Sequence, residues 1–204
     1  MSTAQPTSPP AHQPTDPAER PLPRLAAALE REPRLDRLAG FFGRVAHLVV
    51  PREGPVRDEL RGRSVGHPVH SVLTDLPIGL WAGALALDLT RPAGHDAAAR
   101  RLVGLGLLAV PPTVLTGLTD FRALSGPSPR RVAAVHAVCN TAGTLLAAGS
   151  WQARRSGRHA AGALLTLAGM GAVGAGGYLG GHLAQAMREP PAPPTEGGTG
   201  TGRS

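Results

Sequence analysis

Four long apolar segments dominate the pattern of the chain after residue 68. They cover residues 69–89, 102–119, 132–153 and 160–187. About 20 predominantly apolar residues are enough to cross the hydrocarbon core of a bilayer, and the last three segments contain no Asp, Glu, Lys or Arg. A soluble helical bundle would need a polar face on every helix, which the fourth segment lacks. The pattern therefore predicts four transmembrane helices.

Short charged connectors separate these segments. They lie at residues 91–101, 120–131 and 154–159. Short loops join helices that run in opposite directions. We therefore expect an all-α protein with an up-and-down four-helix transmembrane bundle over residues 65–188.

A shorter helical pattern precedes the bundle. Residues 24–64 are expected to form an amphipathic helix, interrupted near Pro33, and then a charged connector. The apolar face of this helix would lie in the membrane interface or on a partner helix. That face consists of Leu35, Leu38, Phe41, Phe42, Val45 and Leu48. Residues 1–23 and 189–204 are Pro-rich and are expected to be disordered tails, because they have too little apolar surface to bury.

The positive charge of the chain suits either nucleic acid or a lipid bilayer as binding partner, and the positions of the arginines decide between them. All 21 basic residues are arginine, and the formal net charge is +7. The arginines gather at the edges of the apolar segments, and the chain offers no aromatic platform on which bases could stack. Arginines at segment edges suit lipid headgroups and set membrane topology. We therefore expect a bilayer of the cell membrane, and no nucleic acid, as partner; the charged connector before the first segment favours cytoplasmic termini.

Four histidines fall at one end of the predicted bundle. His67 and His70 lie at the entry to the first segment, His136 lies one turn into the third, and His182 lies near the exit of the fourth. In an up-and-down bundle, all four histidines then lie near the same face of the membrane. At a rise of ~1.5 Å per residue, the last three lie roughly 7 to 10 Å inside the nearest flanking arginine. Imidazoles at such depth are costly unless they have partners, so their convergence predicts a site.

Haem b is one group that this site would hold. It needs two axial imidazoles on facing helices, and arginines at the rim would pair with its propionates. The residues expected to bind such a cofactor are His67, His70, His136, His182, Arg63 and Arg131.

A single transition-metal ion is the other group considered. It needs three or four nitrogen or carboxylate ligands. The candidates are His67, His70, His136, His182, Asp75 and Asp120, with Asn140 as an outer hydrogen-bonding partner.

Two functions remain open at this point. The first is electron transfer through haem b or a metal ion, with a quinone, a soluble carrier or a partner protein. The alternative is a structural or scaffolding membrane protein whose His, Asp and Asn side chains only hydrogen-bond the helices together. A transporter would need a polar path, and only Asp88 lies at the far end of the first segment. No catalytic motif stands out, which argues against an enzyme.

Small residues in the fourth segment indicate close helix packing. Gly176 and Gly180, like Gly177 and Gly181, have the small-xxx-small spacing that lets helices approach closely in lipid. These faces predict a homo-oligomer.

Several strings of residues resemble one bacterial membrane family, known as domain of unknown function 2231 (DUF2231). They are GHPVHSVLTDLPIGLWAGALALDL from Gly66, LTGLTD from Leu115, HAVCN from His136, and GGYLGGHL from Gly176. The chain departs at Ser71, where the family usually has a second proline. The resemblance implies a four-span membrane protein. Some relatives carry a Rieske-type iron–sulfur domain after the last span, whereas the Pro- and Gly-rich segment after the last span here has no Cys or His ligands.

Overall fold

The structure is a computed structural model that describes residues 21–64, 66 and 69–185. His67 and most of both predicted tails lie outside the described residues. The N-terminal elements are α1 (Pro21–Arg31), the 3-10 turn η2 (Pro33–Leu35), α2 (Asp36–Val49) and α3 (Pro55–Leu60). They are followed by α4 (Val69–Thr90), α5 (His95–Ala123), α6 (Pro127–Arg155) and α7 (His159–Gln185).

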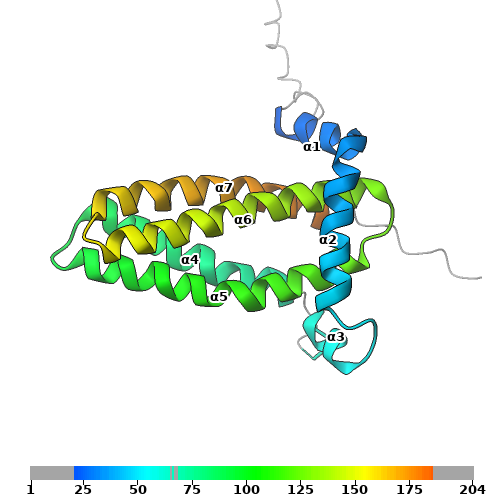
Figure 1. Ribbon diagram of the computed structural model, residues 1–204, viewed down its shortest axis with the longest axis horizontal. Helices are drawn as coiled ribbons and strands as arrows, with labels where there is room; N and C mark the ends of the chain where they lie inside the picture. The colour runs from blue at the N-terminus through cyan, green and yellow to red at the C-terminus, as the bar shows by residue number, and fades with distance from the viewer. Residues whose placement is uncertain (1–20, 65, 67–68, 186–204) are drawn as a thin grey trace, which may run out of the picture.

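The last four helices form the predicted bundle. By length and composition, each of them is able to cross a membrane. Figure 1 shows them side by side, with α4 and α5 joined as one hairpin and α6 and α7 as a second. Each hairpin packs more extensively within itself than against the other. We call the contact between the two hairpins the seam.

The connectors are shorter than the sequence predicts. Helices α5 and α6 begin well before their apolar segments and continue through the paired arginines near their starts. Gly94 and Gly126 precede these two helices with φ of 72° and 75°, which glycine adopts without the steric cost of a side chain. The chain therefore reverses direction within a few residues.

Small residues bring helices of the bundle close together. A Cβ added at Gly143 of α6 would collide with the side chain of Val173, and one at Gly169 of α7 would lie 3.2 Å from the carbonyl oxygen of Gly143. The apolar core beside this contact includes Trp81, whose ring nitrogen donates to the carbonyl of Val103 at 3.3 Å. Van der Waals packing of this kind drives helix association in lipid.

A proline in α4 requires help from α5. Pro77 has no N–H, so the carbonyl of Leu73 lacks its usual helical donor. The Thr113 hydroxyl lies 3.2 Å from that oxygen and 2.8 Å from the carbonyl of Ala109 in its own helix, so its single proton is shared between the two. A side chain of the neighbouring helix thus offers a donor to a backbone group that lipid would leave unpaired.

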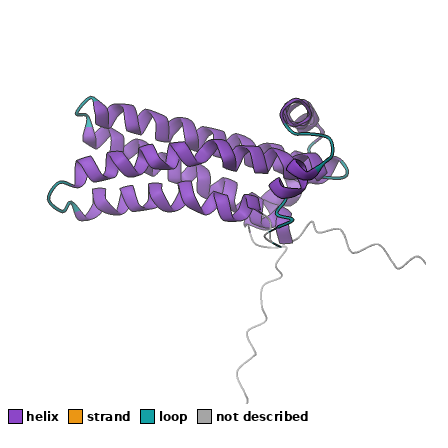
Figure 2. Ribbon diagram, turned by 90° about the horizontal axis from the view of Figure 1, so that it is seen from below, coloured by secondary structure: helices purple, strands orange, loops and turns teal. Residues whose placement is uncertain are grey.

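Helix α2 lies across one end of the bundle (Figures 1 and 2), where α5 ends and α6 begins. The side that it buries consists of Ala39, Gly43 and Ala46. Part of the predicted apolar face points elsewhere, since Phe41 and Leu48 are 51% and 86% exposed. The small residues face the bundle because the guanidinium of Arg130 lies directly over Gly43, where a larger side chain would not fit.

Ion pairs and hydrogen bonds fix both ends of α2. Arg131 of α6 donates to the two carboxylate oxygens of Asp36 at 2.6 and 2.9 Å. It also donates to the carbonyl of Glu30 at 2.9 Å. At the other end, Arg122 donates to the carbonyl of Val50 at 2.7 Å. The N-terminal helices are therefore part of the folded unit.

Acidification should loosen α2 from the bundle. The Arg131 guanidinium, which donates two hydrogen bonds, holds the pKa of Asp36 below its ordinary value of 3.8. A carboxyl with a lowered folded-state pKa stabilises the fold fully above its ordinary value, and this contribution disappears as the pH falls through the folded pKa. We expect hydrogen-exchange protection of α1 and α2 to fall below pH 3.8.

The matched variant is Asp36→Asn, which should show reduced protection of α1 and α2 already at neutral pH. Asp58→Asn, which removes an exposed pair with Arg63, serves as the control. Equal protection of Asp36→Asn and wild type at pH 7 would contradict the role given to this pair.

Candidate functional site

His70 of α4 is oriented by α5. Its Nδ1 lies 3.1 Å from the carbonyl oxygen of Thr113 and 3.3 Å from the hydroxyl of Thr116. A carbonyl oxygen only accepts, so Nδ1 carries the proton and Nε2 keeps its lone pair. A Cβ at Gly117 would lie 2.8 Å from the ring, so this glycine makes room for the imidazole.

His136 of α6 is held in the same way by α7. Its Nδ1 donates to the carbonyl of Gly176 at 2.7 Å, and its Nε2 accepts from the Asn140 amide at 3.0 Å. A Cβ at Gly180 would lie 3.0 Å from the ring. The Gly176–Gly180 spacing therefore serves packing inside the chain, whereas added Cβ atoms at Gly177 and Gly181 would meet nothing.

The two imidazoles meet across the seam. Their ring centres are 6.4 Å apart and their planes are inclined by 77°. One ring comes from each hairpin, and each has its Nδ1 proton on a backbone carbonyl. Of the four histidines that the topology groups at one end of the bundle, these two lie side by side.

His182 does not join this pair. Its Nε2 lies 2.7 Å from the Glu30 carboxylate of α1, in a contact that is partly buried. The two predicted rim arginines are also engaged elsewhere, Arg131 with Asp36 and Arg63 with Asp58. Hydropathy does not predict the pairings of His182 and Arg131, because their partners lie 152 and 95 positions away in the chain.

The predicted carboxylate ligands are not brought to the imidazoles either. Asp75 is exposed on the outside of α4. Asp120 has Arg61 as a charged neighbour. Across residues 21–64, 66 and 69–185, no group of three or more His, Cys, Asp or Glu side chains is arranged to hold a metal ion. What remains of the predicted site is a pair of imidazoles with Asn140 beside it.

Comparison with known proteins places this bundle in a family. A family model described as "Predicted membrane protein (DUF2231)" matches residues 66–188, which include α4 to α7 and more than half of the chain. The chain belongs to the DUF2231 family. No curated protein matches the chain, and no solved structure does. The resemblance noted from the sequence is confirmed.

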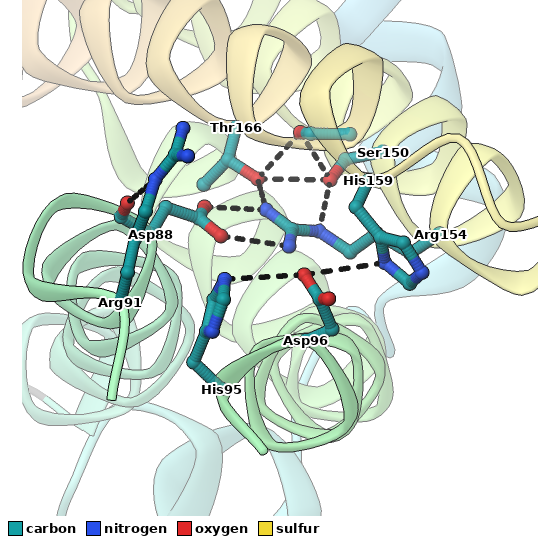
Figure 3. A network of polar contacts seen from close by, with 9 residues as sticks. Asp88, Arg91, His95, Asp96, Ser150, Arg154, His159 and Thr166 are labelled. Carbon is teal, nitrogen blue, oxygen red and sulfur yellow. Dashed lines mark hydrogen bonds and ion pairs between the residues drawn. The ribbon is translucent and has the colours of Figure 1, made fainter. Parts of the chain in front are cut away.

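At the opposite end of this DUF2231 protein lies a polar network that the sequence analysis missed (Figure 3). Arg154 of α6, whose side chain is fully buried, donates to both carboxylate oxygens of Asp88 of α4, at 2.9 and 2.5 Å. It also contacts the hydroxyls of Ser150 and Thr166 at 3.2 and 3.3 Å. Asp88 therefore has a charged partner at this end of the bundle, away from the imidazole pair. The signal was present, because the first and third segments both end on this side.

A second carboxylate lies close to that pair. Asp96 has its Oδ1 3.3 Å from Nε2 of His95 and 3.4 Å from Nδ1 of His159 (Figure 3). These residues come from the first turns of α5 and α7. The contacts connect the two hairpins next to the buried Arg154–Asp88 pair.

Removing one partner of the buried pair should strongly destabilise the bundle. Arg154→Met leaves the Asp88 carboxylate without its counter-charge, and we expect a loss of about 3–5 kcal/mol in the free energy of unfolding, as for other broken buried pairs. The double variant Arg154→Met/Asp88→Leu should recover most of the loss, because no charge is then left buried. Reversible unfolding in mild detergent measures both values.

Arg158→Met is the control, since Arg158 is exposed in the loop that follows. It should change the free energy of unfolding by less than about 0.5 kcal/mol. A single variant Arg154→Met as stable as Arg158→Met would show that the pair is unimportant.

Proposed function

We propose that this membrane protein binds one redox-active group, haem b or a transition-metal ion, between His70 and His136, and that it transfers electrons. The observation that carries the proposal is the imidazole pair across the seam, with ring centres 6.4 Å apart. Two imidazoles that share one metal ion, each nitrogen at ~2 Å from it, have ring centres up to roughly 6 to 7 Å apart. The spacing would therefore allow His70 and His136 to hold one such group together.

The protonation of the rings supports the same proposal. A histidine that binds a metal usually donates its other N–H to a carbonyl or carboxylate, which fixes the tautomer and the ring orientation. The carbonyls of Thr113 and Gly176 take this role here. Ligation through both Nε2 atoms would require Asn140 to release His136.

The donor set would hold a group that takes two nitrogen ligands from the protein better than a four-ligand metal centre, because His182, Asp75 and Asp120 lie elsewhere. Such a group supplies one-electron transfer. The chain itself binds it, orients the two rings and excludes water by packing Gly117 and Gly180 against them. A quinone, a soluble carrier or a partner protein would exchange the electrons.

A structural function is the second candidate, and the same hydrogen bonds favour it. His70 connects α4 to α5, His136 connects α6 to α7, and His182 connects α7 to α1. Interhelical hydrogen bonds of this kind stabilise membrane bundles without any ligand.

Asparagine variants separate the two candidates. In His70→Asn and His136→Asn, the amide can still donate to the carbonyl, but the Nε2 ligand is lost. For a redox protein we expect about one haem or metal ion per wild-type chain and at least about tenfold less in either variant. The measurement is an absorption spectrum, oxidised and then reduced, with metal analysis of detergent-purified protein.

His47→Asn is the matched control, because His47 also donates from Nδ1 to a carbonyl, that of Gly43 in its own helix, at 2.7 Å. It should keep the full content of the bound group. Wild-type protein with neither a Soret band nor a stoichiometric metal refutes the redox proposal and leaves the structural candidate.

We also propose that the protein lies in the cytoplasmic membrane with the imidazole pair near the cytoplasmic side. The charged connector before α4 and the arginines around α2 supply the basic residues that stay in the cytoplasm. A Ser64→Cys variant in a Cys139→Ser background should react with an impermeant maleimide in inverted vesicles and not in intact cells. The reverse labelling pattern would require the opposite orientation.

A further inference from the structure

Helix α4 carries a carboxylate on its outer surface, halfway along the bundle. His70 is level with Thr116 of α5, and Trp81 is level with Val103. Asp75 lies between these levels, so it is level with the middle of α5, which spans His95–Ala123. It is exposed and makes no hydrogen bond or ion pair with any residue that the structure describes. An acidic side chain facing lipid at this depth is costly, so something must cover it.

The surface around Asp75 is shaped for another helix. Exposed small or polar residues recur every third or fourth position along the outside of α4. We call this surface the Asp75 face; it consists of Ser71, Asp75, Gly79, Ala82 and Ala86. A Cβ added at Gly79 would meet nothing within 4 Å. Such a row lets a second helix backbone approach closely in lipid.

The outside of α5 is different. It exposes the large residues Leu105, Leu108 and Val114, which are 52%, 75% and 49% exposed. Large aliphatic side chains are well solvated by lipid tails and need no protein partner. Large residues of α4 also border the Asp75 face, since Val72 and Leu76 are 58% and 52% exposed, and α7 exposes a row of glycines. The unpartnered carboxylate is therefore what singles out the Asp75 face.

We propose that the Asp75 face packs against the same face of a second copy of the chain, in a two-fold symmetric dimer within the membrane. The face is self-complementary, because the Ser71 hydroxyl donates, the Asp75 carboxylate accepts, and the two lie one turn apart. All copies insert in the same orientation, so a two-fold axis along the membrane normal makes the two α4 helices parallel. Asp75 of each copy then reaches Ser71 of the other. This proposal does not depend on a bound redox group.

Disulfide cross-linking tests the contact directly. Cys139 is the only native cysteine, so Cys139→Ser gives a clean background. Gly79→Cys should form a disulfide-linked dimer on mild oxidation in native membranes, because parallel helices in contact bring equivalent Cα atoms within about 7 Å. Leu108→Cys, exposed on α5, is the control and should stay monomeric. Equal cross-linking at both positions, or linkage of residue 79 only to a different protein, overturns the proposal.

Substitutions in the face test its chemistry. In lipid nanodiscs we expect wild type and Asp75→Asn to be dimers, since an amide still accepts from Ser71. Asp75→Leu and Ala82→Ile should associate at least about tenfold more weakly, through loss of the polar contact and of close packing respectively. Leu108→Ile is the matched control and should be dimeric.

The monomer should fold in every case, because the face points away from the core. Unchanged thermal melting of the chain in detergent confirms that a loss of association is not a loss of fold. A monomeric wild type in nanodiscs, or an Asp75→Leu variant as dimeric as wild type, overturns the proposal.

Discussion

A bilayer offers no hydrogen-bonding partners, so every polar group inside it must find one within protein. This constraint explains most of the specific contacts of the bundle. The Thr113 hydroxyl reaches the carbonyl that Pro77 leaves unpaired. Two imidazoles place their protons on carbonyls of neighbouring helices. A buried guanidinium has a carboxylate and two hydroxyls around it. Each of these groups would be expensive alone and becomes stabilising when its partner is supplied.

The two hairpins meet differently in the middle of the bundle and at its ends. Within each hairpin, glycine and alanine allow close backbone contact. Across the seam, the polar contacts connect α4 to α6 at both ends: His70 lies beside His136, and Asp88 binds Arg154. Between them lies an apolar region around Trp81 and Val173. A hydrogen-bonded ion pair is directional and packing is not, so Asp88 and Arg154 define how one hairpin sits on the other at their end. At the other end the two imidazoles lie beside each other and donate their hydrogen bonds within their own hairpins.

The sequence predicts the architecture well because hydropathy and loop length determine it. Four apolar segments and short connectors require an up-and-down bundle, and this in turn brings His70 and His136 to one end. Residue-level pairing depends on helix rotation and on elements distant in the chain. His182 was expected in the site but binds Glu30, 152 positions away. Arg154 was counted with the loop arginines, although helix α6 continues to Arg155 and turns this side chain inward. Such contacts depend on where a helix ends and on which of its faces turns inward. Hydropathy gives the ends only to within a few residues.

The rotation of α4 about its own axis determines which of its two aspartates finds a partner inside the bundle. Asp75 and Asp88 lie in the same apolar segment, and hydropathy treats them alike. They are separated by about three and a half helical turns, which places them on nearly opposite sides of α4. Asp88 faces the bundle and has its counter-charge within the chain. Asp75 faces outward, where the described part of the chain supplies no partner. Since lipid supplies none either, the constraint that organises the interior applies equally to the outer surface, where the proposed second copy would satisfy it.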